Sequence, residues 1–108
     1  MNCKKISFNH ISPKVNSLTP DQLETLFNVY LYLNYDYNFF MSKSKHESFM
    51  NLYFETFTKH QPNTFKTLIN LFTSYTYEHR YPHLLLAIDL IKQDHSLYDI
   101  INTVYHLR

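Results

Sequence analysis

The densest group of side chains with chemical potential lies in YEHRYPH, residues 77–83. It holds Glu78, His79 and His83, whose carboxylate and imidazole groups are common zinc ligands. His79 and His83 are four residues apart, a spacing that places two ligands on one face of a helix. Pro82 lies between them and is expected to end that helix. No cysteine and no His-Glu-x-x-His pattern accompanies them, so we expect a polar loop between helices rather than a metal site.

No spacing of nucleophile and base indicates an enzyme. Serine, histidine and aspartate are present, but no pattern brings them together as hydrolytic catalysis requires. The sequence has no glycine, which excludes the Walker loop, the Rossmann fingerprint and the Gly-x-Ser-x-Gly elbow. The single cysteine, Cys3, has no visible activating base and permits no internal disulfide. We expect a protein without catalytic residues or cofactors, in a reducing cytoplasmic compartment.

Nucleic-acid binding would require clustered basic side chains, and the sequence shows few of them. The net charge is +1, and the close basic pairs are Lys4 with Lys5 and Lys43 with Lys45. TPDQLETL resembles the first helix of homeodomain and MarR-like regulators, but no matching recognition helix follows. Because a dimer could assemble a patch that one chain does not show, a small dimeric DNA-binding regulator is the alternative hypothesis.

Aromatic side chains are the remaining candidates for a contact surface, at 18% of the sequence. Three of them follow a helical spacing on the side opposite the expected core face of the first helix. Another group surrounds one of only two arginines, at a junction between helices. Tyrosine and arginine are enriched at interaction hot spots. The candidate partner-binding residues are Tyr32, Tyr35, Phe39, Tyr77, Arg80 and Tyr81. The alternative is that other helices, or the N-terminal segment, cover the aromatic face.

The first of the elements that must position these residues begins at a clear capping signal. Thr19 can cap a helix, Pro20 suits its first position, and Gln22 completes a capping box. VYLYLNYDYNFF, residues 29–40, can then be interpreted in two ways. Its polar and apolar residues alternate as in a strand, yet its leucines and aromatics also continue the helical spacing of the preceding turn. We predict one helix over about residues 20–40 and keep the strand as the alternative.

Four further helices are expected to start near residues 45, 62, 82 and 97. A second capping box, from Ser44 to Glu47, predicts the first of these starts, and Ser96 predicts the last. HLLLAIDLI is apolar nearly all round, which indicates a helix surrounded by others. The residues expected to be buried there are Leu86, Ala87 and Leu90.

The chain of 108 residues is long enough for one domain with a substantial core. We expect a short extended arm over residues 1–17 and a compact all-α bundle of about five helices over residues 18–108. No apolar run reaches the roughly 18 residues of a membrane span, so no such span is expected.

The composition also indicates that the gene comes from an AT-rich genome. Phenylalanine, tyrosine, isoleucine, asparagine and lysine have AT-rich codons, and these residues are abundant here. We predict a non-enzymatic protein-binding module, an accessory or inhibitory factor of a virus, phage or mobile element. Its partner would be another protein or a second copy of the chain. In size and helix content the sequence is similar to bacteriocin-immunity proteins, which implies an immunity-type bundle as a further alternative.

Overall fold

The computed structural model describes residues 6–35, 38–59 and 62–107, and this part of the chain contains helices and no strand. The all-α prediction is therefore confirmed. Cys3, Lys4 and Lys5 lie outside the described residues. The elements are α1 (Phe8–Asn16), α2 (Pro20–Leu33), α3 (Lys43–Lys59), α4 (Pro62–Tyr75), the short 3-10 helix η1 (Glu78–Arg80), α5 (Tyr81–Lys92) and α6 (Leu97–Tyr105).

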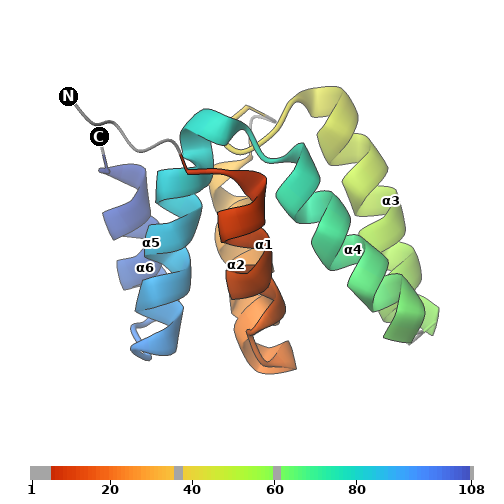
Figure 1. The fold of residues 1–108 in the computed structure, drawn as a ribbon, viewed down its shortest axis with the longest axis horizontal. Helices are drawn as coiled ribbons and strands as arrows, with labels where there is room; N and C mark the ends of the chain where they lie inside the picture. The colour runs from red at the N-terminus through yellow and green to blue at the C-terminus, as the bar shows by residue number, and fades with distance from the viewer. Residues whose placement is uncertain (1–5, 36–37, 60–61, 108) are drawn as a thin grey trace.

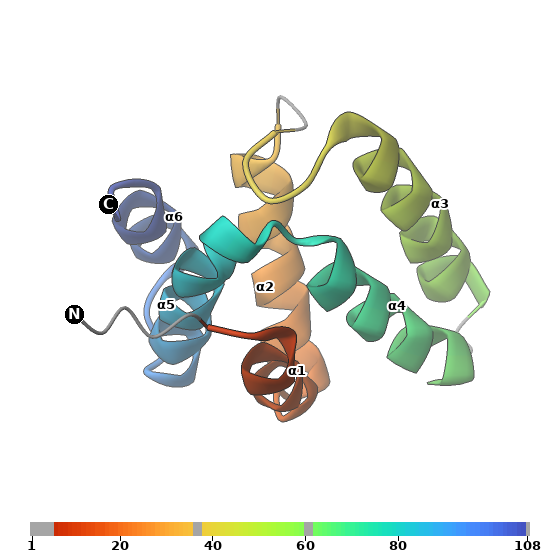
Figure 2. The same ribbon diagram turned by 45° about the horizontal axis from the view of Figure 1, so that its top comes forward.

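The helices form two side-by-side pairs joined by a central pair (Figures 1 and 2). On one side α3 packs against α4, and on the other α5 packs against α6. Between them, α2 contacts both α5 and α6, while α1 contacts α4 and α5. None of the described helices is long and apolar enough to cross a membrane.

Residues Phe8–Asn16 form a helix, so the prediction of an extended arm was wrong for this segment. Ile11 and Val15 are four residues apart and fully buried, which gives α1 one apolar face. Pro13 lies inside the helix, where it cannot donate a backbone hydrogen bond. Burial of the apolar face against α4 and α5 outweighs that loss. The alternation of Ile6 and Phe8 with polar neighbours was the misleading signal.

The predicted start of α2 is confirmed, and its predicted end is wrong. Thr19 Oγ1 accepts a hydrogen bond from the Gln22 backbone at 3.2 Å, and Gln22 Oε1 accepts one from the Thr19 backbone at 2.9 Å. The helix ends at Leu33. The Asn34 side chain then accepts hydrogen bonds from two backbone N–H groups of the following loop. Residues 29–40 are therefore neither one continuous helix nor a strand across the described positions.

The start of α6 agrees with the prediction from the sequence, and the start of α3 lies two residues before its predicted position. Ser96 Oγ accepts from the Asp99 backbone at 3.2 Å, as a cap should. Helix α3 begins at Lys43 rather than after Ser44, and the Ser42 hydroxyl accepts from the Lys45 backbone at 3.4 Å. The prediction that Ser44 is the cap was wrong by two residues.

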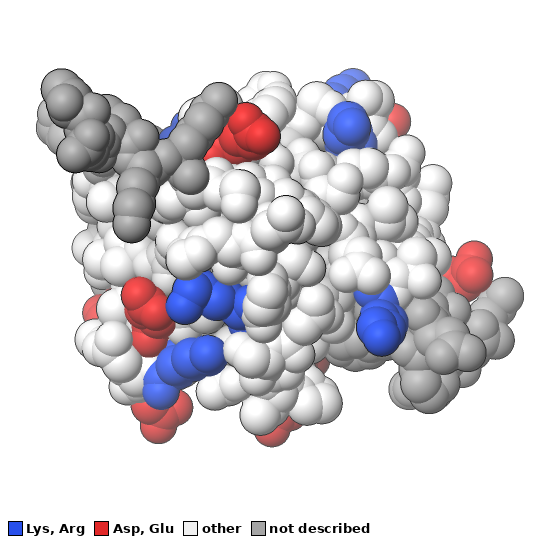
Figure 3. Space-filling view, viewed as in Figure 1, with Lys and Arg blue, Asp and Glu red and all other residues white. Residues whose placement is uncertain are grey.

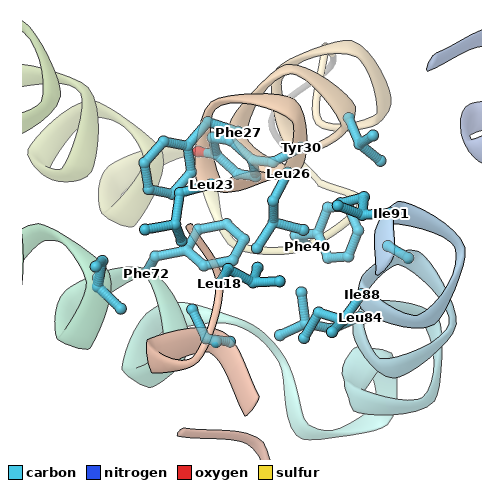
Figure 4. Packing of buried hydrophobic residues seen from close by; sticks show 14 of the residues in the cluster. Leu18, Leu23, Leu26, Phe27, Tyr30, Phe40, Phe72, Leu84, Ile88 and Ile91 are labelled. Atoms are coloured by element: carbon cyan, nitrogen blue, oxygen red, sulfur yellow. The ribbon is translucent and has the colours of Figure 1, made fainter. Parts of the chain in front are cut away.

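The core forms where α2 faces its neighbours (Figure 4). Side chains of α2, among them Leu26, Phe27 and Tyr30, extend toward α4 on one side and α5 on the other. The labelled core residues of those neighbours include Phe72 of α4 and Ile88 of α5. On α5, Ala87 is fully buried as expected. Leu86 and Leu90 are only partly buried, which corrects the prediction for both. Helix α5 is covered by α1, α2 and α6 but keeps one side open at Asp89.

Candidate protein-binding face

Four strongly exposed tyrosines lie on α6 and around the end of α2, and we call them the tyrosine face. Tyr32 lies in the last turn of α2 and Tyr35 lies two residues beyond its end, with 67% and 86% of their surfaces exposed. Tyr98 and Tyr105 lie on α6, with 76% and 62% exposed. A large aromatic side chain left this open by its own core is a common mark of an interaction surface.

A groove of about 620 Å³ runs between the two helices that carry this face. Three of the four tyrosines help to line it, and none of its lining residues is Asp, Glu, Lys or Arg. The lining residues are Tyr32, Leu33, Leu97, Tyr98, Ile101, Asn102, Tyr105 and His106. The groove exists because Ile100 and Val104 of α6 are buried in the core while Leu97 and Ile101 are not. The apolar stripe of α6 is therefore wider than the surface that α2 and α5 cover.

Tyr32, Tyr35 and Phe39 were predicted to share one helix face, and that prediction was wrong because α2 ends at Leu33, before Tyr35 and Phe39. Phe39 lies in the loop after α2 and is partly buried. Its ring is 4.0 Å from the Arg80 guanidinium carbon in a cation–π contact. The ring also stacks with Tyr105, with ring centroids 6.3 Å apart. Phe39 thus packs against one member of the tyrosine face, Tyr105 of α6.

Arg80 fixes the surroundings of this ring. Its Nε donates to the Phe39 carbonyl at 2.9 Å, and its Nη1 lies 3.2 Å from His83 Nε2. The same imidazole nitrogen lies 3.1 Å from the Leu107 carbonyl, just beyond the end of α6. Burial and the nearby Arg80 charge lower the pKa of His83 below its ordinary value, so the ring is held neutral. This cluster ties the loop after α2 to the end of α6.

The other two predicted contact residues lie nearer the core. Tyr81 is only 3% exposed, and its hydroxyl lies 3.4 Å from the Thr73 carbonyl. Tyr77 is partly buried, stacks with His79 at 5.1 Å between ring centroids, and donates its backbone N–H to Phe40. Tyr32 and Tyr35 are therefore exposed to solvent. Phe39, Tyr77, Arg80 and Tyr81 are partly or fully buried and make contacts within the chain.

The α6 residues of the groove were not among the contact residues expected from the sequence. These residues are Tyr98, Asn102 and Tyr105, which are spaced four and three apart. This second stripe lies next to the buried one, and its spacing was the available signal. Leu97 and Ile101 are the apolar residues of α6 that the core covers incompletely.

Two other kinds of site, a metal centre and a basic nucleic-acid surface, find no support in the described residues and on the face drawn in Figure 3. Among the described residues, no group of three His, Cys, Asp or Glu side chains is placed to hold a metal ion. On the side of the molecule drawn in Figure 3, lysines and acidic residues are interspersed and form no stripe of one sign. That pattern differs from the basic track that nucleic-acid binding requires.

Comparison with known proteins gives no relative from which a function could be carried over. No family model, no curated protein and no solved structure matches the chain.

Proposed function

We propose that the protein is a non-enzymatic binding module that docks on another protein through the tyrosine face. The observation that carries this proposal is the uncharged groove between α2 and α6, bordered by strongly exposed tyrosines. Tyrosine combines a large apolar ring with a hydroxyl that can donate or accept, and it is enriched where binding energy is concentrated.

The mechanism of docking follows from the shape and polarity of the groove. A partner would place apolar side chains against Leu33, Leu97 and Ile101, and the tyrosine hydroxyls would bind polar groups at the rim. The helices beneath are held by a packed core, so the face does not have to be ordered when the partner binds. Binding of this kind blocks or alters a partner without any chemical step.

The AT-rich composition supports an origin in a virus, phage or mobile element. In that setting the module would be an accessory or inhibitory factor, and its partner would be a protein of the host.

Affinity capture with matched variants tests the proposal. The tagged protein and the Tyr32→Ala/Tyr98→Ala variant are compared on extract of the native host, with Phe54→Ala as the control. Phe54 is a suitable control because it is 61% exposed on α3 and does not line the groove. We expect the same protein to be captured by the wild type and by Phe54→Ala, and to be lost with the double variant. Capture that is equal for all three proteins would contradict the proposed face.

A further inference from the structure

The tyrosine face is large enough to supply most of one side of a protein interface. With about 200 Å² for each tyrosine, the exposed parts of Tyr32, Tyr35, Tyr98 and Tyr105 amount to roughly 600 Å². A standard interface buries about 800 Å² per partner, and the largest apolar patch on a typical monomer is about 300–600 Å². The groove residues Leu97 and Ile101 add further apolar surface.

The chemistry of this face makes it complementary to itself. In a symmetric dimer each copy presents the same patch, so a patch with net charge would repel its own image. No lining residue of this groove is a lysine, an arginine or an acid. Tyrosine hydroxyls and the Asn102 amide can each donate and accept, so two identical faces can satisfy each other's polar groups.

The face also has both a protrusion and a recess. Tyr98, which is 76% exposed, projects from α6 beside a groove of about 620 Å³. From this shape, size and neutrality we infer that a second copy of the chain occupies the α2/α6 groove, with tyrosines of each protomer entering the groove of the other around a two-fold axis. This inference rests on the proposed function, since it assigns an additional occupant, a second copy of the chain, to the same site. Binding of a different protein at this face would then compete with self-association.

Sedimentation equilibrium over chain concentrations from about 1 μM to about 1 mM tests the dimer. We expect the wild type and Phe54→Ala to approach twice the chain mass with the same dissociation constant. Tyr32→Ala/Tyr98→Ala should weaken the association at least about tenfold, while its circular dichroism stays that of the wild type and its melting temperature stays that of the wild type at chain concentrations where both are monomeric.

The outcomes separate the dimer from the proposed function. A wild type that stays monomeric throughout the range overturns the dimer, as does a dimer that the double variant leaves intact. In either case a captured host protein that still depends on Tyr32 and Tyr98 would leave the binding module standing. If the wild type shows neither self-association nor capture that depends on the tyrosine face, both the dimer and the proposed function are overturned.

Discussion

Asn34 is a fully buried polar residue at the point where α2 ends. Its side-chain oxygen accepts hydrogen bonds from the backbone N–H groups of Phe40, at 2.6 Å, and Met41, at 3.1 Å. These contacts turn the chain back so that both of those side chains enter the core. Buried polar groups are normally hydrogen-bonded, and the Asn34 side-chain oxygen accepts from two buried backbone N–H groups at once.

Replacement of Asn34 by alanine should leave two buried N–H groups without an acceptor. Since each such group costs about 1–3 kcal/mol, we expect Asn34→Ala to lower the free energy of unfolding by about 2–6 kcal/mol. Asn28→Ala, at an exposed position of α2, is the control and should change it by no more than about 0.5 kcal/mol. Urea denaturation measures both. A loss below about 1 kcal/mol for Asn34→Ala would show that the loop is held in another way.

The folded protein lowers the pKa of two histidines, His46 and His83. For His46 the cause is burial, although the nearby Glu47 opposes the shift. His46 Nδ1 lies within hydrogen-bond reach of the Tyr30 hydroxyl, whose own pKa is raised by burial. In His83, burial and Arg80 lower the pKa, and Nδ1 finds no hydrogen-bond partner among the described residues. Protonation of either ring would oppose the folded arrangement.

Stability should therefore decrease in mildly acidic solution. The unfolded chain takes up protons at these histidines as pH falls below their ordinary pKa of 6.5, whereas the folded protein does so only at lower pH. The free energy of unfolding should be constant above about pH 7.5 and should fall as pH decreases below about 6.5. Urea melts at several pH values measure this. His83→Gln should flatten the dependence, and His95→Gln, at an exposed position, should keep it. An unchanged slope in His83→Gln would contradict the role given to that ring.

At the scale of the elements, the starts of α2 and α6 were predictable from the sequence, whereas the end of α2 and the existence of α1 were not. Thr19 and Ser96 signal their helices through local hydrogen bonds that the sequence alone specifies. The end of α2 depends on Asn34 and on a loop that pairs with it across six and seven residues, which no periodicity reveals. Helix α1 likewise depends on burial against α4 and α5, distant in the sequence.

The same contrast applies to the candidate site. Tyr32 was predictable as an open position because it belongs to the capped helix, whose period is clear, whereas Tyr35 lies beyond the end of that helix at Leu33. The exposure of Tyr98 and Tyr105 depends on how much of α6 its neighbours cover, which is a tertiary property. The buried position of Tyr81 and the partly buried position of Arg80 also depend on partners elsewhere in the chain, Thr73 and Phe39.

The capping box of α2 offers a test at this scale. Thr19→Ala removes the acceptor for the Gln22 backbone N–H, so we expect a loss of about 1 kcal/mol in the free energy of unfolding. Thr103→Ala, at an exposed site within α6, is the matched control and should change it by less than about 0.5 kcal/mol. Equal effects of the two changes, measured by urea denaturation, would mean that the cap adds nothing beyond helix propensity.

At the scale of the whole molecule, Phe27 and Tyr30 of α2 help to join the α3–α4 pair to the rest. The Phe27 ring makes edge-to-face contacts with Phe49 and Tyr53 of α3 and with Phe72 of α4, with ring centroids 5.5 to 5.8 Å apart. Such contacts add to the energy of burying the rings. The attachment of this pair to α2 is therefore concentrated in a small aromatic cluster.

Truncation of Phe27 should loosen that attachment more than the opposite side of the molecule. We expect Phe27→Ala to cost about 3–5 kcal/mol, the range for a buried phenylalanine. In hydrogen exchange, the amides of α3 and α4 should lose more protection than those of α5 and α6, through partial opening. Phe54→Ala, which removes an exposed ring from α3, should leave the exchange pattern unchanged. A uniform loss of protection across all helices would show a single cooperative unit instead.

The position of α1 has a consequence for how the chain folds as it is made. This helix is synthesised before the two helices that bury its Ile11 and Val15 face, α4 and α5, which end at Tyr75 and Lys92. A nine-residue helix is too short to be stable alone in water. At about 5–20 residues per second, several seconds of synthesis separate α1 from its binding surface. During that interval the segment stays exposed to chaperones and proteases, and it can take up its native position only after α4 and α5 have been made.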